Sequence, residues 1–168
     1  MAKLYVAANA SGKSVFLHEG EIASNLFRHL PGFDPVVVWG KSADGTVYQP
    51  GDTALAPPGG SRLLIVTFPP PHAQEGHADP ADIGIEMAER LPGLAETFEA
   101  DGSGMHRTPT YDYGIVLDGE IQLELDDGEV RVLRKGDVSI HDRTRHGWRN
   151  TSPTPCTIAF VMIGRPDD

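Results

Sequence analysis

The sequence predicts an all-β fold that is interrupted by one short helical insertion. Apolar and polar residues alternate in short runs along most of the chain, which is the pattern of half-buried strands. The chain also has 19 Gly and 14 Pro, and these residues favour the many turns that a β fold needs. Because 168 residues suffice for one hydrophobic core, we expect a single domain over residues 1–168.

The first part of that domain, residues 1–68, is expected to contribute strands. Two hairpins are predicted there, from strands at residues 3–6, 14–17, 35–40 and 47–49. Residues 62–68 form a continuous apolar run, which indicates a strand buried on both faces. For residues 20–30 the pattern leaves two alternatives open, a short helix or an irregular segment.

Residues 69–104 differ from the rest and predict the helical insertion. Asp79 is expected to cap the helix, with Pro80 at the first helical position. Apolar residues then recur at four-residue spacing, at Ile83, Met87 and Leu91. The segment is too short to form its own core, so we expect it to lie between two strands of the same domain, with its helix inside residues 79–99.

Residues 105–165 are expected to form the central part of the domain, and from residue 111 onward only strands and turns are predicted. The expected strands are residues 113–117, 120–125, 129–133, 138–141, 147–150 and 157–163. The strand at 113–117 is apolar on both faces, so both faces need cover. The N-terminal segment or a second subunit could supply that cover, and we therefore expect a homodimer.

Charge and composition exclude several classes of protein. The net charge is −10 and the pI about 5.0, which argues against general binding to nucleic acid or to an anionic membrane. No apolar run is long enough to span a membrane, and the N-terminus does not read as a signal peptide, so we expect a cytoplasmic protein. The single cysteine, Cys156, lies in a strand-like context and is expected to be a buried structural thiol.

Two polar clusters flank the predicted hairpin and carry the candidate chemistry. The first holds His106, Thr108 and Asp112, and the second holds His141 and His146. Two histidines and a carboxylate that converge inside a β-barrel would suit a divalent transition metal.

These clusters resemble the two motifs of the cupin superfamily, G-x5-H-x-H-x3-4-E-x6-G and G-x5-P-x-G-x2-H-x3-N. His106 stands at the first His place and Asp112 at the Glu place, seven residues before Gly119. Thr108 occupies the place of the second His, which is a departure from the family pattern.

The second motif is matched by three residues and altered at two. Gly136, His146 and Asn150 are in place, with one residue fewer before the turn. His141 and Arg143 stand where the family has Pro and Gly. The chain is most similar to small single-domain cupins, several of which are suspected lyases or dehydratases.

The resemblance implies a double-stranded β-helix, or jelly roll, with ligands bound near one mouth of the barrel. It also implies one divalent metal ion, Fe, Mn, Ni or Zn, held by His106, Asp112 and His146. Two other roles are possible for Asp112. It could be a hydrogen-bond acceptor or general base beside the metal, or a structural residue in a turn. A set of two histidines and one carboxylate leaves coordination positions open for a substrate.

Further residues are candidates for binding a substrate or moving a proton. Arg107 and Arg143 lie at loop positions and could bind a carboxylate or phosphate, although ordinary solvated charge explains them as well. Thr108 and Trp148 could line the pocket, and Asp112 or His141 could move a proton. His72 and His77 in the insertion could supply another ligand.

The function expected from these residues and the resemblance is that of a metal-dependent enzyme acting on a small polar organic molecule, with a carboxylate-bearing substrate as one option. A lyase, either a dehydratase or a decarboxylase, is preferred because of the similar cupins. The alternatives are an Fe(II) dioxygenase and a non-catalytic cupin that binds a ligand as a sensor.

Overall fold

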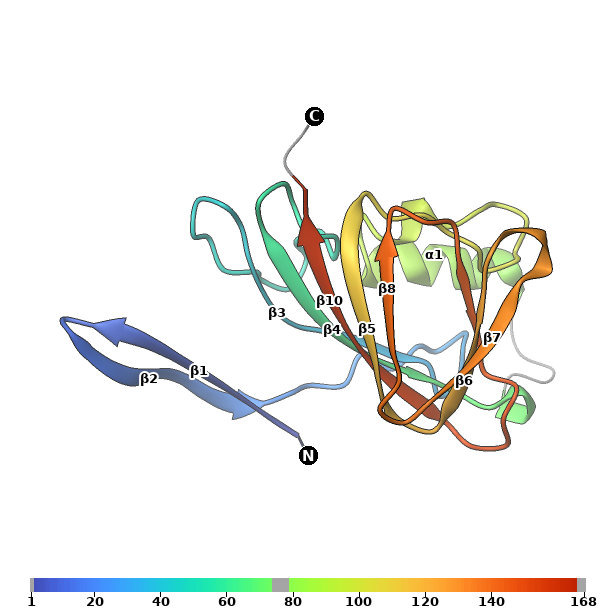
Figure 1. Cartoon of the computed structure of the whole chain (residues 1–168), viewed down its shortest axis with the longest axis horizontal. Coiled ribbons are helices and arrows are strands. Elements are labelled where there is room, and N and C mark those ends of the chain that lie inside the picture. Colours follow the sequence, from blue (N-terminus) through green and yellow to red (C-terminus); the bar gives the residue numbers. More distant parts are fainter. Residues whose placement is uncertain (1, 74–78, 166–168) are drawn as a thin grey trace.

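The computed structural model describes residues 2–73 and 79–165, and two antiparallel sheets make up the barrel. The larger sheet has the strand order β3 (Asp34–Lys41), β4 (Ser61–Phe68), β10 (Cys156–Gly164), β5 (Thr110–Asp118) and β8 (Val138–Asp142). The smaller has the order β7 (Val130–Arg134), β6 (Glu120–Glu124) and β9 (Gly147–Arg149). Figure 1 shows the two sheets facing each other, which confirms the predicted jelly roll.

The hydrophobic core fills the space between these two sheets. Val116 from β5 and Ile158 from β10 pack there against Ile121 from β6 and Leu133 from β7. Cys156 is fully buried in the same cluster, as the sequence predicts for a structural thiol. Residues on each strand alternate between this interior and the outside, because successive side chains of a strand point to opposite faces.

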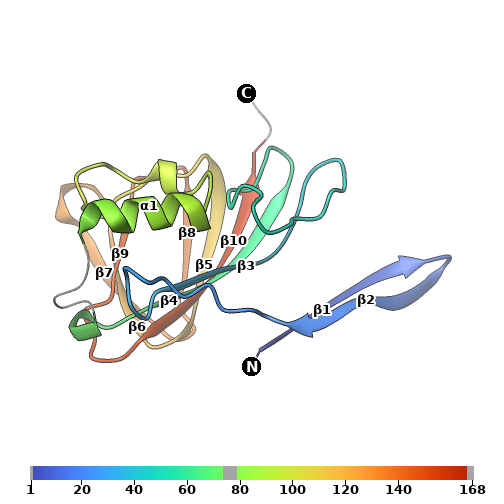
Figure 2. The same ribbon diagram turned by 180° about the vertical axis from the view of Figure 1, so that it is seen from behind.

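The N-terminal strands form a hairpin that stands apart from the barrel. β1 (Lys3–Ala10) and β2 (Lys13–Glu21) are longer than predicted and pair only with each other. Ser11 and Gly12 make the turn between them with positive φ angles of 53° and 81°, as in a two-residue hairpin loop. Figures 1 and 2 show this hairpin projecting away from the rest of the molecule. Of residues 20–30, which the sequence left open, the first two complete β2 and the rest contain no helix.

The predicted helical insertion is present between β4 and β5. α1 (Pro80–Arg90) is capped by Asp79, whose Oδ1 accepts a hydrogen bond from the backbone N–H of Ala81 at 2.9 Å. Short 3-10 helices lie on either side, η1 (Pro71–Ala73) and η2 (Ala95–Thr97). Leu91, directly after α1, is buried against Phe27, so the insertion packs on the segment that precedes β3. Figure 2 shows α1 lying across one side of the barrel.

Two predictions about the first 68 residues were wrong. Residues 47–49 do not form a strand, because the predicted hairpin is reduced to an isolated antiparallel bridge between Val47 and Lys41. Two backbone hydrogen bonds flank this bridge, from Ser42 to Thr46 and from Tyr48 to Gly40. β4 is not buried on both faces, since its residues alternate between buried and half-exposed. Its continuous apolar run reflects one face in the core and one apolar face that points outward.

No helix of the described residues is long and apolar enough to cross a membrane.

Candidate functional site

The site is built around His106 and His146, which the fold places directly opposite each other. Their backbones exchange two hydrogen bonds, each 2.9 Å long, in an isolated antiparallel bridge. Side chains of directly opposed residues lie on the same face of such a pair. The two imidazole rings are accordingly 4.3 Å apart between centroids. The two motif segments, forty residues apart in sequence, thus form one site.

Two more aromatic rings extend this pair into a stack. Phe98, just after η2, stacks on His106 at 4.3 Å and an interplanar angle of 23°. His141 stacks on the other side of His146 at 4.1 Å and 28°. Trp148 meets both His141 and His146 edge-on, at 5.7 and 6.0 Å. The stack packs the histidines tightly, and all three are buried.

Hydrogen bonds fix the orientation of each ring. The Nδ1 atom of His106 lies 3.2 Å from the carbonyl oxygen of Gly104, and that of His146 lies 2.9 Å from the carbonyl oxygen of Thr144. A carbonyl can only accept, so both Nδ1 atoms carry the proton and both Nε2 atoms present a lone pair. This is the arrangement in which a carbonyl partner orients a metal-binding histidine.

His141 differs from the other two histidines because both of its nitrogens have side-chain partners. Its Nδ1 lies 3.2 Å from Oγ1 of Thr144, and its Nε2 lies 3.1 Å from Oγ of Ser139. Hydroxyl groups can donate or accept, so these contacts satisfy a neutral ring in either tautomer. His141 is therefore less available to a ligand than His106 or His146.

Asp112 supplies the carboxylate of the site from β5, where it pairs in register with His141 of β8. The side chain is buried, and Thr108 donates a hydrogen bond to its Oδ2 at 2.7 Å. Its Oδ1 is buried and accepts no hydrogen bond of good geometry from the described residues, and Oγ1 of Thr110 makes none either, although the Thr110 hydroxyl lies close enough to Asp112 to lower its pKa. A buried polar atom without a partner is uncommon in a native fold and calls for a ligand, an ion or water.

Burial sets the protonation of these groups. Burial, together with the smaller effect of the neighbouring His146, lowers the pKa of His106 to about 4 and that of His141 to about 3. The pKa of His146 is also lowered by burial, whereas burial raises that of Asp112. At neutral pH the three imidazoles are consequently uncharged, which is the form that binds metal ions.

The types of donor atom in the site fit a divalent metal, but the described side chains are not arranged as a complete coordination site. Two lone pairs on Nε2 atoms and the buried Oδ1 of Asp112 match the donors that transition metals prefer. Among the described residues, however, no three His, Cys, Asp or Glu side chains are arranged to hold a metal ion together. Three-point binding would require Asp112 or a histidine to turn from its present contacts.

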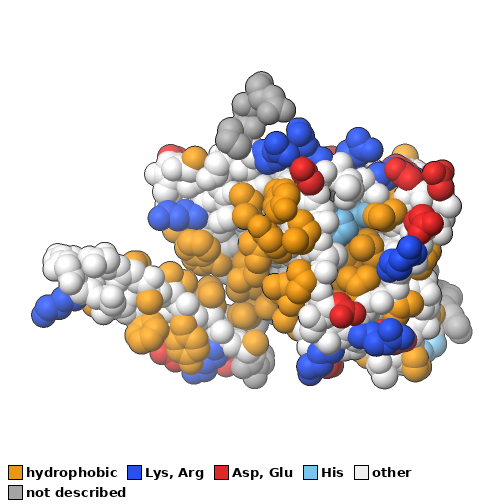
Figure 3. All heavy atoms as spheres, in the orientation of Figure 1, with side chains coloured by type: hydrophobic (Ala, Val, Ile, Leu, Met, Phe, Trp, Pro, Cys, Tyr) orange, Lys and Arg blue, Asp and Glu red, His pale blue; other side chains and the backbone are white. Residues whose placement is uncertain are grey.

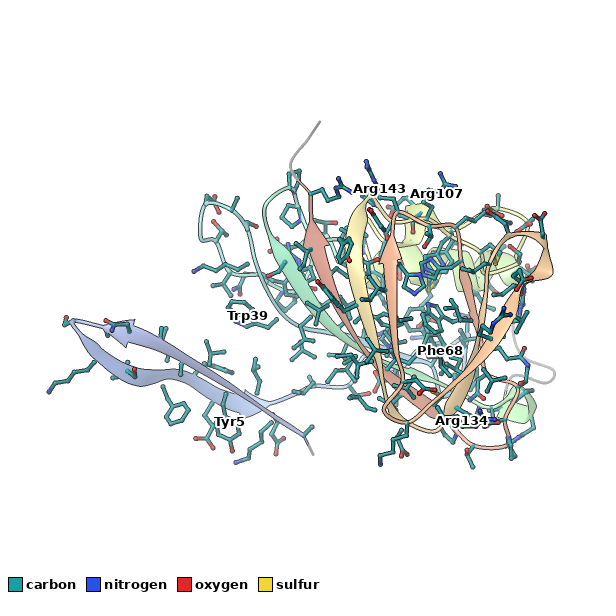
Figure 4. The ribbon with its side chains drawn as sticks, viewed as in Figure 1. Tyr5, Trp39, Phe68, Arg107, Arg134 and Arg143 are labelled. Carbon is teal, nitrogen blue, oxygen red and sulfur yellow. The ribbon has the colours of Figure 1, made fainter. Side chains whose placement is uncertain are left out.

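The predicted arginines gather beside this stack. Arg107 and Arg143 line a pocket of about 440 Å³ together with Arg145 and Thr144. Thr144 also contacts His141 and His146, so the pocket adjoins the histidines. Figure 4 shows Arg107 and Arg143 close together at one end of the barrel.

The sequence argument preferred Arg107 and Arg143 to Arg145, because an odd-numbered residue on one strand with His146 was expected to face away from it; the structure begins β9 only at Gly147 and places Arg145 at this pocket. Its guanidinium makes two bonds of 2.6 Å to the Glu99 carboxylate and one of 2.9 Å to Asp126. These two partners hold it at the pocket, and neither is close to it in sequence.

The other residues that were considered for the site lie at different distances from the three histidines. Trp148 borders the histidines and also packs on the hydrophobic core. His72 is exposed on η1 and makes no ring contact or hydrogen bond to the three histidines. His77 lies outside the described residues. Asn150 bonds the carbonyls of Phe68 and Thr154, which is a structural role. Phe98 was missed, because a lone aromatic in the insertion gives no sequence signal.

A jelly roll with buried imidazoles and a carboxylate at one mouth defines the class of this protein, and comparison with known families agrees. Residues 96–163 match the family model of the cupin domain. This segment contains Phe98, His106, Asp112, His141 and His146. This segment of the chain is a cupin domain.

Curated relatives include proteins of fungal biosynthesis. Phomopsin biosynthesis cluster protein C' of Diaporthe leptostromiformis is 60% identical over 50 residues, which are 30% of this chain and 26% of that protein. The cupin-domain-containing oxidoreductase srdB of Neurospora crassa is 33% identical over 130 residues, 76% of this chain and 60% of that protein. The chain thus spans between about a quarter and three fifths of the length of these relatives.

Among solved structures, the DMSP lyase DddQ of Ruegeria pomeroyi superposes with a TM-score of 0.46 and 15% identity. The match covers 84% of this chain and 52% of that chain.

Proposed function

We propose that this chain is a cupin enzyme that acts on a small polar organic molecule with the help of one divalent metal ion, Fe, Mn, Ni or Zn. The observations that carry the proposal are the buried Oδ1 of Asp112, which accepts no hydrogen bond of good geometry, the closeness of this carboxylate to His146, whose pKa it raises, and the oriented Nε2 lone pairs of His106 and His146. His106, His146 and Asp112 would hold the metal. When bound, the metal would polarise a substrate oxygen or supply redox chemistry at its open positions.

The chain's own residues prepare the site in three ways. The carbonyls of Gly104 and Thr144 keep the Nε2 atoms of His106 and His146 directed away from the backbone. The low pKa values of the histidines keep protons from competing for those lone pairs. Thr108 holds Oδ2 of Asp112, which leaves Oδ1 as the free ligand atom.

Substrate recognition is assigned to the pocket next to the stack. Arg107 and Arg143 place guanidinium groups where a carboxylate at the barrel mouth could be bound by paired hydrogen bonds. Phe98 and Trp148 cover the histidines with apolar rings, so water is kept from much of the reacting centre.

Asp112 is a better proton carrier than His141 in any state in which it is not a ligand. Burial raises the pKa of Asp112, so its carboxyl group takes up a proton more readily than an exposed one. His141 has a pKa of about 3 and both nitrogens engaged, so it takes up a proton poorly.

The class of reaction is best supported as oxidoreductase chemistry. The relative srdB and three further relatives carry that description in their names. Two histidines with one carboxylate and open positions also suit non-haem iron. A lyase is the second candidate, because the arginine-lined pocket beside a Lewis acid would equally suit removal of water or carbon dioxide from a carboxylate substrate.

Metal content tests the proposal directly. Untagged protein, supplied anaerobically with Fe(II), Mn(II), Ni(II) or Zn(II) and then desalted, should retain about one ion per chain by elemental analysis. His106→Ala and His146→Ala should lose it, and the exposed His72→Ala should keep it. Asp112→Asn should weaken binding by roughly tenfold or more if Asp112 is a ligand. Full occupancy in both histidine variants, or no retention by the wild type, would overturn the proposal in favour of a ligand-binding sensor.

Two further measurements separate the reaction classes. A thermal-shift screen of small organic acids, with Arg107→Ala as the comparison, identifies compounds that bind the pocket. Those compounds are then incubated with the iron-loaded and the zinc-loaded protein. Turnover that needs iron and consumes dioxygen indicates an oxidoreductase, whereas equal turnover with zinc indicates a lyase.

A further inference from the structure

The three histidines of the candidate site are almost closed off from solvent. His106 is 8% exposed, and His141 and His146 are each 3% exposed. Figure 3 shows only small areas of histidine side chain on the face that it presents. A substrate has to touch the groups that act on it, so a part of the protein that covers the histidines must move before an organic molecule can reach them.

Residues 95–99, which contain η2, cover the histidines from the side of the insertion, and we call them the covering segment. The segment lies beside the bridge between His106 and His146 as a third strand, because Phe98 forms an isolated antiparallel bridge with His106. Phe98, His106 and His146 therefore form one row of side chains on the same face. Figures 1 and 2 show the chain that follows α1 at the upper end of the barrel, where Figure 4 labels Arg107 and Arg143.

Few backbone hydrogen bonds attach the covering segment to the barrel. The backbone N–H of Glu99 donates to the carbonyl of Met105 at 2.9 Å, and that of Arg107 donates to the carbonyl of Thr97 at 3.4 Å. The second of these bonds is long for an N–H···O contact. The bridge between the two histidines, by comparison, has two bonds of 2.9 Å. The covering segment is therefore attached more weakly than the strands on which it lies.

The two ends of the covering segment are held to different degrees. Before it, Leu91 is buried in the core and Leu94 packs against the same cluster. After it, residues 100–104 form a turn in which Gly102 and Gly104 have positive φ angles of 73° and 74°. Around the Cβ position of either glycine, no atom of the described residues beyond its chain neighbours lies within 4 Å. Glycine adopts positive and negative φ about equally readily, so this turn can change its backbone angles without a clash and act as a hinge.

One ion pair joins the covering segment to the barrel through side chains. The Nε and Nη2 atoms of Arg145 both donate to the carboxylate of Glu99 at 2.6 Å. Two parallel bonds of this kind make an arginine–carboxylate pair strong and directional. Arg145 is also bonded to Asp126 in η3 (Asp126–Gly128), so the barrel holds this guanidinium independently of Glu99. The side chains of the pair are 31% and 37% exposed, so water can replace the bonds when the segment moves away.

We propose that the covering segment is a lid of the candidate site, in which Phe98 closes over His106 and the ion pair between Glu99 and Arg145 is the latch. The lid turns on residues 100–104. When it is closed, the Phe98 ring keeps water from His106. When it is open, a ligand can reach His106 and His146. The proposal rests on the proposed function for what enters the site, whereas the opening itself is a property of the metal-free chain.

The chemical reactivity of individual histidines in the metal-free chain tests the proposal. Diethyl pyrocarbonate modifies unprotonated imidazole nitrogens, and mass spectrometry of peptides gives the rate at each histidine. The rate in the urea-unfolded chain divided by the rate in the folded chain is a protection factor, which measures how rarely the site opens. The exposed His18 and His72 should be almost unprotected, whereas His106 should be protected at least about tenfold. Alkylation of Cys156, which is fully buried in the core, reports global unfolding and should show much higher protection.

Glu99→Gln removes the charge of the latch and keeps the shape of the side chain. The protection of His106 should fall about three- to tenfold, while that of Cys156 should not change. The matched control is Glu124→Gln, because Glu124 pairs with Arg149 between β6 and β9 and makes no hydrogen bond to the covering segment. This variant should protect His106 as the wild type does. Raising the salt concentration from about 0.05 to about 0.5 M should lower the protection of His106 in the wild type but not in Glu99→Gln.

Phe98→Ala tests the part of the lid that closes over His106. The protection of His106 should fall at least about tenfold, whereas Phe98→Leu, which keeps a large apolar side chain, should stay within about threefold of the wild type. Circular dichroism checks the fold of each variant. If Phe98→Ala does not fold, Glu99→Gln and the salt dependence of the wild type decide instead.

The outcomes that overturn the proposal are distinct from those that overturn the proposed function. Protection of His106 as low as that of His72, or as high as that of Cys156, overturns the lid. Unchanged protection in Glu99→Gln overturns the latch, and unchanged protection in a folded Phe98→Ala overturns the role of Phe98. All samples contain a chelator, so metal binding does not enter these results. A wild type that never retains metal overturns the proposed function and leaves the lid in place, and a lid that fails these tests leaves the metal site in place.

Discussion

The stacked histidines should make the metal-free protein sensitive to mild acid. The pKa of His106 is lowered to about 4 and that of His141 to about 3, from 6.5 for the unfolded chain, mainly by burial. A histidine whose pKa is lower in the folded than in the unfolded chain stabilises the fold at pH values above 6.5. This stabilisation is lost as the pH falls from 6.5 toward the pKa of the folded state. Protonation of each histidine should therefore lower the free energy of unfolding by about 1.4 kcal/mol for each pH unit within that window. For the two histidines together the loss should be about 2.7 kcal/mol per pH unit.

His141→Gln isolates one of these contributions. Glutamine has a donor and an acceptor for the hydroxyl groups of Ser139 and Thr144, but it does not titrate. The loss of stability between about pH 6 and pH 4 should become less steep by about 1.4 kcal/mol per pH unit. The free energy of unfolding at neutral pH should also fall, because the stacking contacts with His146 and Trp148 are altered.

The measurement is urea unfolding at a series of pH values in the presence of a chelator, so that no metal holds the histidines. His72→Gln is the control, because His72 is exposed and should leave the slope unchanged. Asp112 acts in the opposite direction, because burial raises its pKa and the residue therefore stabilises the fold as the pH falls. In Asp112→Asn the free energy of unfolding should accordingly decrease more steeply with falling pH. A wild-type slope in His141→Gln would refute the assignment of acid sensitivity to this ring.

Two further predictions concern hydrogen bonds to buried carboxylates. Thr108→Val removes the donor to Oδ2 of Asp112 and should lower the free energy of unfolding by about 1–3 kcal/mol at neutral pH, measured by urea unfolding. An unchanged free energy would show that the carboxylate has another partner. Glu86→Gln should cost roughly 2–4 kcal/mol in thermal or urea unfolding, because this buried carboxylate accepts from the backbone of Arg28 and His29. Glu89 is exposed, so Glu89→Gln should leave the free energy of unfolding unchanged. Equal losses of free energy in both variants would contradict the stabilising role of the Glu86 hydrogen bonds.

Local patterns in the sequence were sufficient for most of the fold. The alternation of apolar residues predicted the strands after residue 105, and Asp79 followed by Pro80 predicted the start of α1. Both signals depend on neighbouring residues only, because strand faces repeat every two residues and helix caps act within one turn. Residues 47–49 were predicted wrongly for the same reason, since whether a short run pairs as a strand depends on a distant partner.

The candidate site was predicted in part. Motif spacing selected His106, Asp112 and His146, and the fold places them at one mouth of the barrel. The stacking of Phe98 on His106 could not be predicted, because it requires the insertion to return across the barrel. The same holds for Arg145, which two carboxylates distant in sequence hold at the pocket.

The sequence by itself determined the class of fold, the position of the helix and the residue types of the site, because these follow from periodicity and spacing along the chain. Only the tertiary structure decided how those residues meet. It paired His106 with His146 across a bridge, occupied both nitrogens of His141 and left Oδ1 of Asp112 without a hydrogen bond of good geometry. It also set the order and register of the five strands in the larger sheet, because strand register is a relation between distant segments that no local pattern contains.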